Sequence, residues 1–142
     1  MTEQGGKALF SFLPTLLDKE ICLKIAFTTS GVTLDAPLDP RFGRAPRFLL
    51  YNMENGSFEI IDNAQNLSAA QGAGIQSAET LLRAGADALV TGHCGPKAFR
   101  VLSAAGVAVY NTTAATVQEA LNAYKAGKLQ PADEANAEGH WS

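Results

Sequence analysis

The sequence predicts a single α/β domain built on a mixed five-stranded sheet, with the element order β-β-β-α-β-α-β-α. Two observations lead to this prediction. Apolar, β-favouring runs recur along the chain, and after the third run each gap holds a helical pattern that ends at a glycine. The chain has 142 residues, of which 46% are hydrophobic and 18% charged, and this suits one domain with a substantial buried core.

The first three strands are expected at residues 23–29, 48–53 and 58–63. Between the second and third strands lies the turn Glu54-Asn55-Gly56-Ser57, and an Asn-Gly pair is a strong hairpin signal. These two strands should therefore be antiparallel neighbours. If the first strand is antiparallel to the second, it runs in the same direction as the third.

Three helices are expected at residues 75–84, 96–105 and 117–126, each followed by a glycine, which is a typical helix stop. Thr116 and Glu119 have the spacing of a capping box in front of the third helix. Strands at 86–90 and 107–110 separate the helices. Right-handed crossovers should make these two strands parallel to the third strand.

Four loops should gather at one end of this sheet, because each follows the carboxyl end of a parallel strand: 30–44, 64–74, 91–96 and 111–115. Open α/β sheets bind their ligands at that end. The sequence therefore predicts a binding site formed by these loops.

The loop that follows the strand at 86–90 carries the most distinctive chemistry. Gly92, His93, Cys94 and Gly95 lead into a helix, and Lys97 lies in its first turn. Free N–H groups and the positive end of the helix dipole favour an anion there, and together with a nearby cation they favour a thiolate. Thiolates bind soft metals such as copper(I). We therefore treat all five residues as candidate cofactor contacts, with Cys94 and His93 as candidate metal ligands.

Each of these assignments has a simpler alternative. Cys94 could be a small residue tolerated in a tight loop, His93 could hydrogen-bond the loop backbone, and Lys97 could be a solvated helix residue. Gly72 and Gly74 are candidates for ligand binding, but close helix–sheet packing would explain them equally well.

Arg41 and Arg44 lie in the segment Asp-Pro-Arg-Phe-Gly-Arg at 39–44 and are candidate anion contacts, because arginine offers several donors in a fixed geometry. Alternatively they anchor the loop, with Arg41 paired to Asp35 or Asp39. Such an exposed pair would contribute little stability.

Charge, hydrophobicity and the placement of a few residue types argue against several classes of protein. A net charge of −3 argues against nucleic-acid binding, which needs a basic face. No apolar run approaches the roughly 20 residues of a membrane span. Cys22 and Cys94 are isolated, which fits a reducing cytoplasm better than a disulfide scaffold. A two-metal nuclease is disfavoured because such sites need converging carboxylates, whereas the first strand ends in Thr28, Thr29 and Ser30.

Four motifs in this order resemble the dinitrogenase iron-molybdenum cofactor biosynthesis family. They are Asp-Pro-Arg-Phe-Gly-Arg (39–44), Gly-Ala-Gly-Ile-Gln (72–76), Thr-Gly-x-x-Gly-Pro-x-Ala-Phe (91–99) and Ala-Gly-Val-x-Val-Tyr (105–110). The resemblance covers residues 23–129 and implies a ribonuclease-H-like fold. Residues 1–22 would be an N-terminal extension and 130–142 a mobile tail. His93 and Cys94 occupy positions that vary among relatives, so the resemblance supports the loop more firmly than these two side chains.

The resemblance also implies a function. The family includes nitrogenase-cofactor carriers and orange-protein-like proteins that hold a molybdenum–copper sulfide cluster. We therefore expect a cytoplasmic, non-enzymatic carrier of an anionic molybdenum-containing sulfide cluster, of Mo–Cu or Mo–Fe type, which the isolated protein need not retain. Cluster donor or acceptor proteins would be its partners, and the chain would be a monomer or weak homodimer. The alternative is a regulatory or partner-binding module for a small anion.

Overall fold

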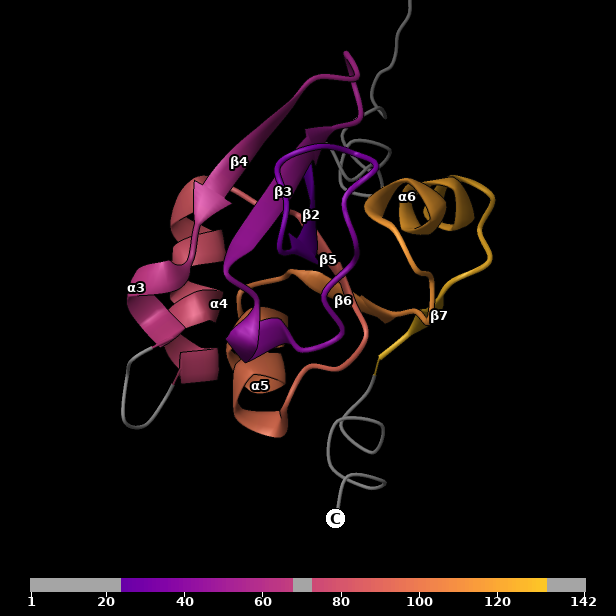
Figure 1. Ribbon diagram of the computed structural model, residues 1–142. Coiled ribbons are helices and arrows are strands. Elements are labelled where there is room, and N and C mark those ends of the chain that lie inside the picture. The colour runs from indigo at the N-terminus through magenta and orange to yellow at the C-terminus, as the bar shows by residue number, and fades with distance from the viewer. Residues whose placement is uncertain (1–23, 68–72, 133–142) are drawn as a thin grey trace, which may run out of the picture.

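The computed structural model describes residues 24–67 and 73–132, which form one α/β domain around a six-stranded mixed sheet (Figure 1). Its strands, in spatial order β4-β3-β2-β5-β6-β7, are β2 (Lys24–Thr29), β3 (Arg47–Asn52), β4 (Phe58–Asp62), β5 (Ala88–Thr91), β6 (Ala108–Asn111) and β7 (Gln130–Pro131). The helices are α3 (Ala64–Leu67), α4 (Ala73–Ala84), α5 (Pro96–Ala104) and α6 (Val117–Lys125), with a short 3-10 helix η2 (Phe42–Arg44).

The strand directions agree with the sequence prediction. The hairpin around Asn55 and Gly56 joins β3 and β4 as antiparallel neighbours, and β2 is antiparallel to β3. Strand β5 is parallel to both β2 and β6. As a result β2, β4, β5 and β6 all run the same way, and their carboxyl ends lie at the same end of the sheet.

The predicted number of strands was wrong by one. Gln130 and Pro131, which the sequence placed in a mobile tail, pair antiparallel with Asn111 and Tyr110 of β6. Two residues that include a proline carry no periodic strand signal, so only the open edge of β6 reveals this pairing. The short helix α3 was likewise expected to be loop. The rest of the predicted tail, 133–142, and the predicted extension, 1–22, lie outside the described residues.

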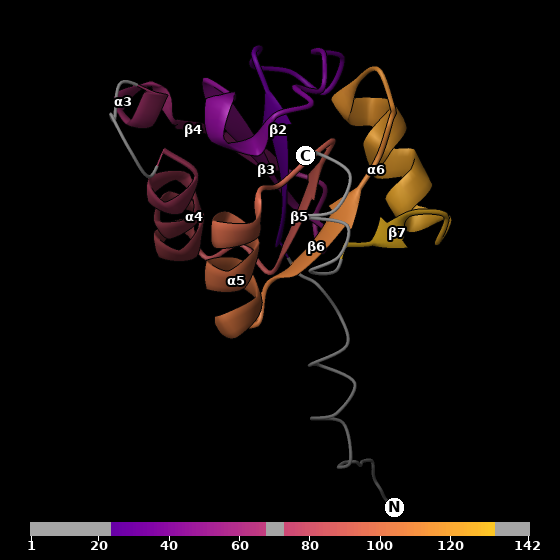
Figure 2. The same cartoon turned by 90° about the horizontal axis from the view of Figure 1, so that it is seen from below.

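Helices cover both faces of the sheet, as Figure 2 shows. Alternate residues of each strand face opposite layers. In β2, Ala26 packs in the cluster that includes Leu81 of α4 and Leu102 of α5, whereas Ile25 packs in the cluster that includes Leu121 of α6. The domain is therefore a three-layer sandwich, with its sheet buried between α4 and α5 on one side and α6 on the other.

The helix ends follow local sequence signals. Thr116 caps α6 by accepting a hydrogen bond from the Glu119 amide (3.1 Å), and the Glu119 carboxylate accepts one from the Ala115 amide (3.1 Å). The first bond is the one that the capping-box spacing predicts, whereas Glu119 reaches the amide of Ala115, one residue before the N-cap, and not the amide of Thr116. Gly85, Gly106 and Gly127 follow α4, α5 and α6 with positive φ angles, as the predicted helix stops require. In the part of the chain that the structure describes, no helix has the length and apolar character needed to cross a bilayer.

Candidate functional site

The loops at the carboxyl ends of the parallel strands meet, as predicted. The Phe42 amide donates to the His93 carbonyl (3.0 Å), and the Leu38 amide donates to the Ala115 carbonyl (3.0 Å). Beneath these loops the buried Thr28 hydroxyl donates to the Asp39 carbonyl (2.6 Å). Loop 30–44 is thereby bonded to β2, to loop 91–96 and to loop 111–115.

These loops approach one another closely because glycine lies at the crossing point. A β-carbon on Gly92 would lie only 2.7 Å from the carbonyl oxygen of Pro40. Any side chain at position 92 would therefore push the two loops apart. Gly92, which the sequence offered as a cofactor contact, thus permits the close approach of two loops in this structure.

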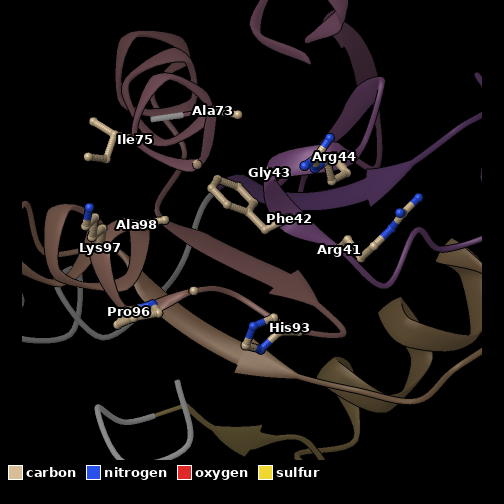
Figure 3. Close-up of a pocket in the computed structure, with 12 residues that line it drawn as sticks. Arg41, Phe42, Gly43, Arg44, Ala73, Ile75, His93, Pro96, Lys97 and Ala98 are labelled. Atoms are coloured by element: carbon tan, nitrogen blue, oxygen red, sulfur yellow. The ribbon is translucent and has the colours of Figure 1, made fainter. Parts of the chain in front are cut away.

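A cavity of about 490 Å³ opens where η2, α4 and α5 converge (Figure 3). Four short segments line it: 41–44, the first turn of α4 at 73–75, His93, and the start of α5 at 95–98. Phe42, Ile75 and Ala98 give the cavity an apolar side. These three residues were not among the sequence candidates, although all of them lie inside motifs that the sequence singled out.

Two helices begin at this cavity. The N-cap of α5 is Gly95, whose missing side chain makes no capping hydrogen bond, and Pro96 in the first turn has no N–H. The amides of Lys97 and Ala98 are therefore directed past the helix end, where the dipole is positive. Helix α4 presents its first turn from Ala73 to the same cavity. Together, the two helix starts favour a negatively charged occupant.

Cationic side chains surround the cavity. Arg41, Arg44 and Lys97 are exposed and line it. The Nε atom of Arg41 lies 3.8 Å from Asp39 Oδ1, so the predicted pairing with Asp39 exists. The side chain of Arg41 is 67% exposed, and such a pair holds its guanidinium only weakly. In Figure 3 the Arg41 guanidinium extends away from the two helix starts, whereas Lys97 points toward Ile75.

Cys94 occupies a different environment from the one expected. It is 2% exposed and packs in the core cluster with Phe42, Ala98 and Leu102. Burial raises the pKa of its thiol from 9.0 to about 12. The expectation of a thiolate was therefore wrong, because desolvation outweighs the helix dipole and the nearby lysine. Sequence proximity to a helix start could not show that this side chain is enclosed by the core.

His93 does line the cavity, and it also lines a second cavity of about 630 Å³ on the side of Thr112 and Thr113. Gly92 lies on that second cavity and not on the first. Across residues 24–67 and 73–132, no three His, Cys, Asp or Glu side chains are placed to share a metal ion. Of the nine sequence candidates, the first cavity brings together Arg41, Arg44, Gly74, His93, Gly95 and Lys97. Gly72 lies outside the described residues.

Comparison with known proteins confirms the resemblance that the motifs predict. Residues 22–127 match the family described as "Dinitrogenase iron-molybdenum cofactor". The chain belongs to this family. Its members are cofactor-carrier proteins that are generally not catalytic.

Solved structures agree with this membership. The apo form of the orange protein from Desulfovibrio gigas is 38% identical and superposes with a TM-score of 0.76, covering 79% of this chain and 94% of that chain. A NifB-type protein from Thermotoga is 34% identical, with a TM-score of 0.69 and coverage of 77% and 92%. A relative found by sequence gives the same result. It is an uncharacterized protein of Methanocaldococcus jannaschii, 32% identical over 96 residues, which are 66% of this chain and 80% of the relative.

Proposed function

We propose that this member of the dinitrogenase iron-molybdenum cofactor family binds and carries an anionic molybdenum-containing sulfide cluster, of Mo–Cu or Mo–Fe type. The cavity between η2, α4 and α5 would hold the cluster. One observation carries the proposal: two helix starts and the cations Arg41, Arg44 and Lys97 surround a single cavity of about 490 Å³. Family membership and the likeness to the orange protein support it.

The chemistry of the cavity suits such a ligand. Amide N–H groups and guanidinium groups donate hydrogen bonds to negatively charged acceptors, and each helix start contributes about 0.3–1 kcal/mol of anion stabilisation. Phe42, Ile75 and Ala98 offer an apolar surface to the weakly hydrated sulfides of a cluster. The protein would therefore hold the cluster through its charge and its polarizable sulfur surface.

Cys94 and His93 are the two candidate side chains that could bond directly to a metal of the cluster. Ligation by Cys94 would require the thiol to leave the core, because it is 2% exposed. His93 lines the cavity and is better placed to reach a metal of the cluster. We therefore infer that anion contacts dominate retention, with His93 as the candidate ligand on the cavity wall.

The proposed role involves no bond-making step by the protein. The chain would act in the cytoplasm as a monomer or weak homodimer, receive the cluster from a donor protein and pass it to an acceptor. The alternative function is a module that binds a small anion such as phosphate or a carboxylate. The same helix starts and cations would suit that ligand, and the experiment below separates the two.

The experiment is a titration of the purified protein with tetrathiomolybdate and copper(I), followed by gel filtration, molybdenum analysis and visible absorption. We expect molybdenum to co-elute with the protein together with a charge-transfer band. Failure of the wild type to retain molybdenum would contradict the cluster proposal. Phosphate or carboxylate binding in its place would then support the small-anion module.

The variant Gly95→Asp tests the location of the ligand. A β-carbon at position 95 meets no atom within 4 Å, and φ −64° with ψ 165° suits any residue. The new carboxylate would cap the amides of Lys97 and Ala98 and repel an anion, so stability should rise by about 0.5 kcal/mol while molybdenum binding is lost. Gly95→Ala is the matched control and should retain binding. Unchanged binding in Gly95→Asp would place the ligand elsewhere.

A further inference from the structure

A group of buried polar side chains lies behind the cavity wall. This group, the Asn63 cluster, consists of Asn63, Asn66, Ser77 and Thr80. Asn63 directly follows β4, Asn66 lies in α3, and the other two lie in α4. Figure 1 shows where β4, α3 and α4 lie. Asn63 and Ser77 are fully buried, and the other two are 8% exposed. Buried polar groups cost stability unless their hydrogen bonds are made, and apolar residues usually fill such positions. Four together therefore indicate a specific structural task.

The amide of Asn63 bridges two segments that line the cavity. Its Nδ2 donates to the carbonyl of Ala45 (2.7 Å), the residue directly after η2, and to the hydroxyl of Ser77 in α4 (3.0 Å). Its backbone N–H donates to the Pro46 carbonyl (2.8 Å). One side chain thus connects the end of η2 with the second turn of α4.

The remaining contacts fix the orientation of that amide. The Ser77 hydroxyl donates back to Asn63 Oδ1 (3.2 Å), and Asn66 Nδ2 donates to the same oxygen (2.6 Å). Asn66 Nδ2 also donates to the Thr80 hydroxyl (3.0 Å), one turn further along α4. Because both donor hydrogens and the acceptor of the Asn63 amide are engaged, the amide has a single favourable orientation.

The same helix touches η2 at a second point. A β-carbon on Gly43 would lie 3.2 Å from the Cα atom of Gly74, so the two backbones are in close contact at the first turn of α4. The Asn63–Ser77 hydrogen bonds hold the helix one turn later. Two attachments along one helix determine the direction of its axis, and with it the direction of the N–H groups of its first turn.

We propose that Asn63 and Ser77 are positioning residues for the cavity: they hold the first turn of α4 against η2, so that its N–H groups and Arg44 reach the same anion. Ligand contacts lose much of their value when displaced by as little as an ångström, so such support would control affinity. The predicted change in ligand affinity rests on the proposed anion binding. The predicted loosening of the first turn of α4 does not depend on any ligand.

The test compares Ser77→Ala with Thr116→Ala. Ser77→Ala removes one hydroxyl from the cluster, whereas Thr116→Ala removes the cap of α6 on the opposite face of the sheet. Both should lower stability, but only Ser77→Ala should weaken tetrathiomolybdate binding, by about tenfold, the equivalent of one or two hydrogen bonds. Asn63→Ala should weaken binding further if it folds. Equal affinities in Ser77→Ala and Thr116→Ala would overturn the positioning role.

A second arm needs no ligand. The amides of residues 77–80 bond to the carbonyls of the first turn of α4 in a regular helix, so their hydrogen exchange reports the opening of that turn. Exchange at 77–80 should accelerate by about tenfold in Ser77→Ala, with α5 unaffected, and should remain at the wild-type rate in Thr116→Ala. Wild-type exchange at 77–80 in Ser77→Ala would refute the inference. Absence of thiomolybdate binding in the wild type would instead refute the proposed function. The exchange measurement would still decide whether the Asn63 cluster holds α4 in place.

Discussion

Gly43 of η2 and Gly74 of α4 are in backbone contact: a β-carbon on Gly43 would lie 3.2 Å from both the Cα atom and the amide nitrogen of Gly74. Residues 43 and 74 are distant in sequence, yet both line the same cavity. The contact brings Arg44 beside the first turn of α4. The proposed anion site therefore depends on two glycines that contact each other as well as on the groups that would bind the ligand.

The substitution Gly43→Ala should separate these two segments. The added methyl group would lie 3.2 Å from Gly74, which is closer than ordinary van der Waals contact, so α4 or η2 must shift by a few tenths of an ångström. We expect a loss of about 1–3 kcal/mol in the free energy of unfolding, together with weaker thiomolybdate binding. Chemical denaturation and molybdenum retention would measure the two effects. Gly95→Ala is the control, and equal binding by the two variants would contradict this prediction.

Arg44 should contribute to binding through its charge. We expect Arg44→Gln to weaken thiomolybdate binding by about three- to tenfold at low salt, because the guanidinium is exposed and partly screened. The difference from wild type should shrink as salt is added. Lys128→Gln is the control for the loss of one positive charge, since Lys128 is exposed beyond the end of α6. If both variants lost affinity equally, net charge and not the position of Arg44 would determine binding.

The thiol of Cys94 should be unreactive in the folded protein. Burial raises its pKa to about 12, and the reactive species is the thiolate. In a Cys22→Ser background, labelling by a thiol reagent at pH 8 should be at least about 100-fold slower in native protein than in denaturant. Rapid labelling of the native protein would show that the thiol reaches the surface. Molybdenum binding that persists in Cys94→Ala would favour anion contacts over ligation by Cys94.

The same pKa shift predicts how stability depends on pH. The thiol pKa is higher in the folded state than its ordinary value of 9.0, so the folded state retains its proton longer than the unfolded chain does. The contribution of the protonated Cys94 thiol to folding stability is therefore complete below pH 9, and it is lost as the pH rises toward about 12. Denaturation curves between these values should therefore be less pH-dependent in Cys94→Ala than in wild type. Identical dependence would show that other groups govern alkaline unfolding.

Features governed by neighbouring residues could be predicted from the sequence. The hairpin at Asn55-Gly56, the Thr116 cap of α6, and the glycine stops of the helices each follow from the conformations available to a few adjacent residues. The gathering of the four loops could also be predicted, because the directions of parallel strands follow from the helices between them.

What required the tertiary structure was contact between distant segments. Strand β7 forms because the edge of β6 is open to Gln130 and Pro131, and nothing in those two residues indicates a strand. Cys94 and His93 are adjacent, yet one side chain is enclosed by the core and the other lines the cavity. Burial depends on what packs against each side chain from other elements, so sequence proximity could not distinguish them.

The sequence by itself thus determined the family, the order of five of the six strands with the three longer helices, and the end of the sheet where the loops gather, because motifs and periodicity are local properties. Only the tertiary structure decided which candidates share one cavity, since Arg44, Gly74 and Gly95 come from three separate segments. It also revealed the Asn63 cluster, three of whose hydrogen bonds join residues 14 or 18 positions apart. Such bonds depend on the packing of α4 against α3 and η2, which no local pattern specifies.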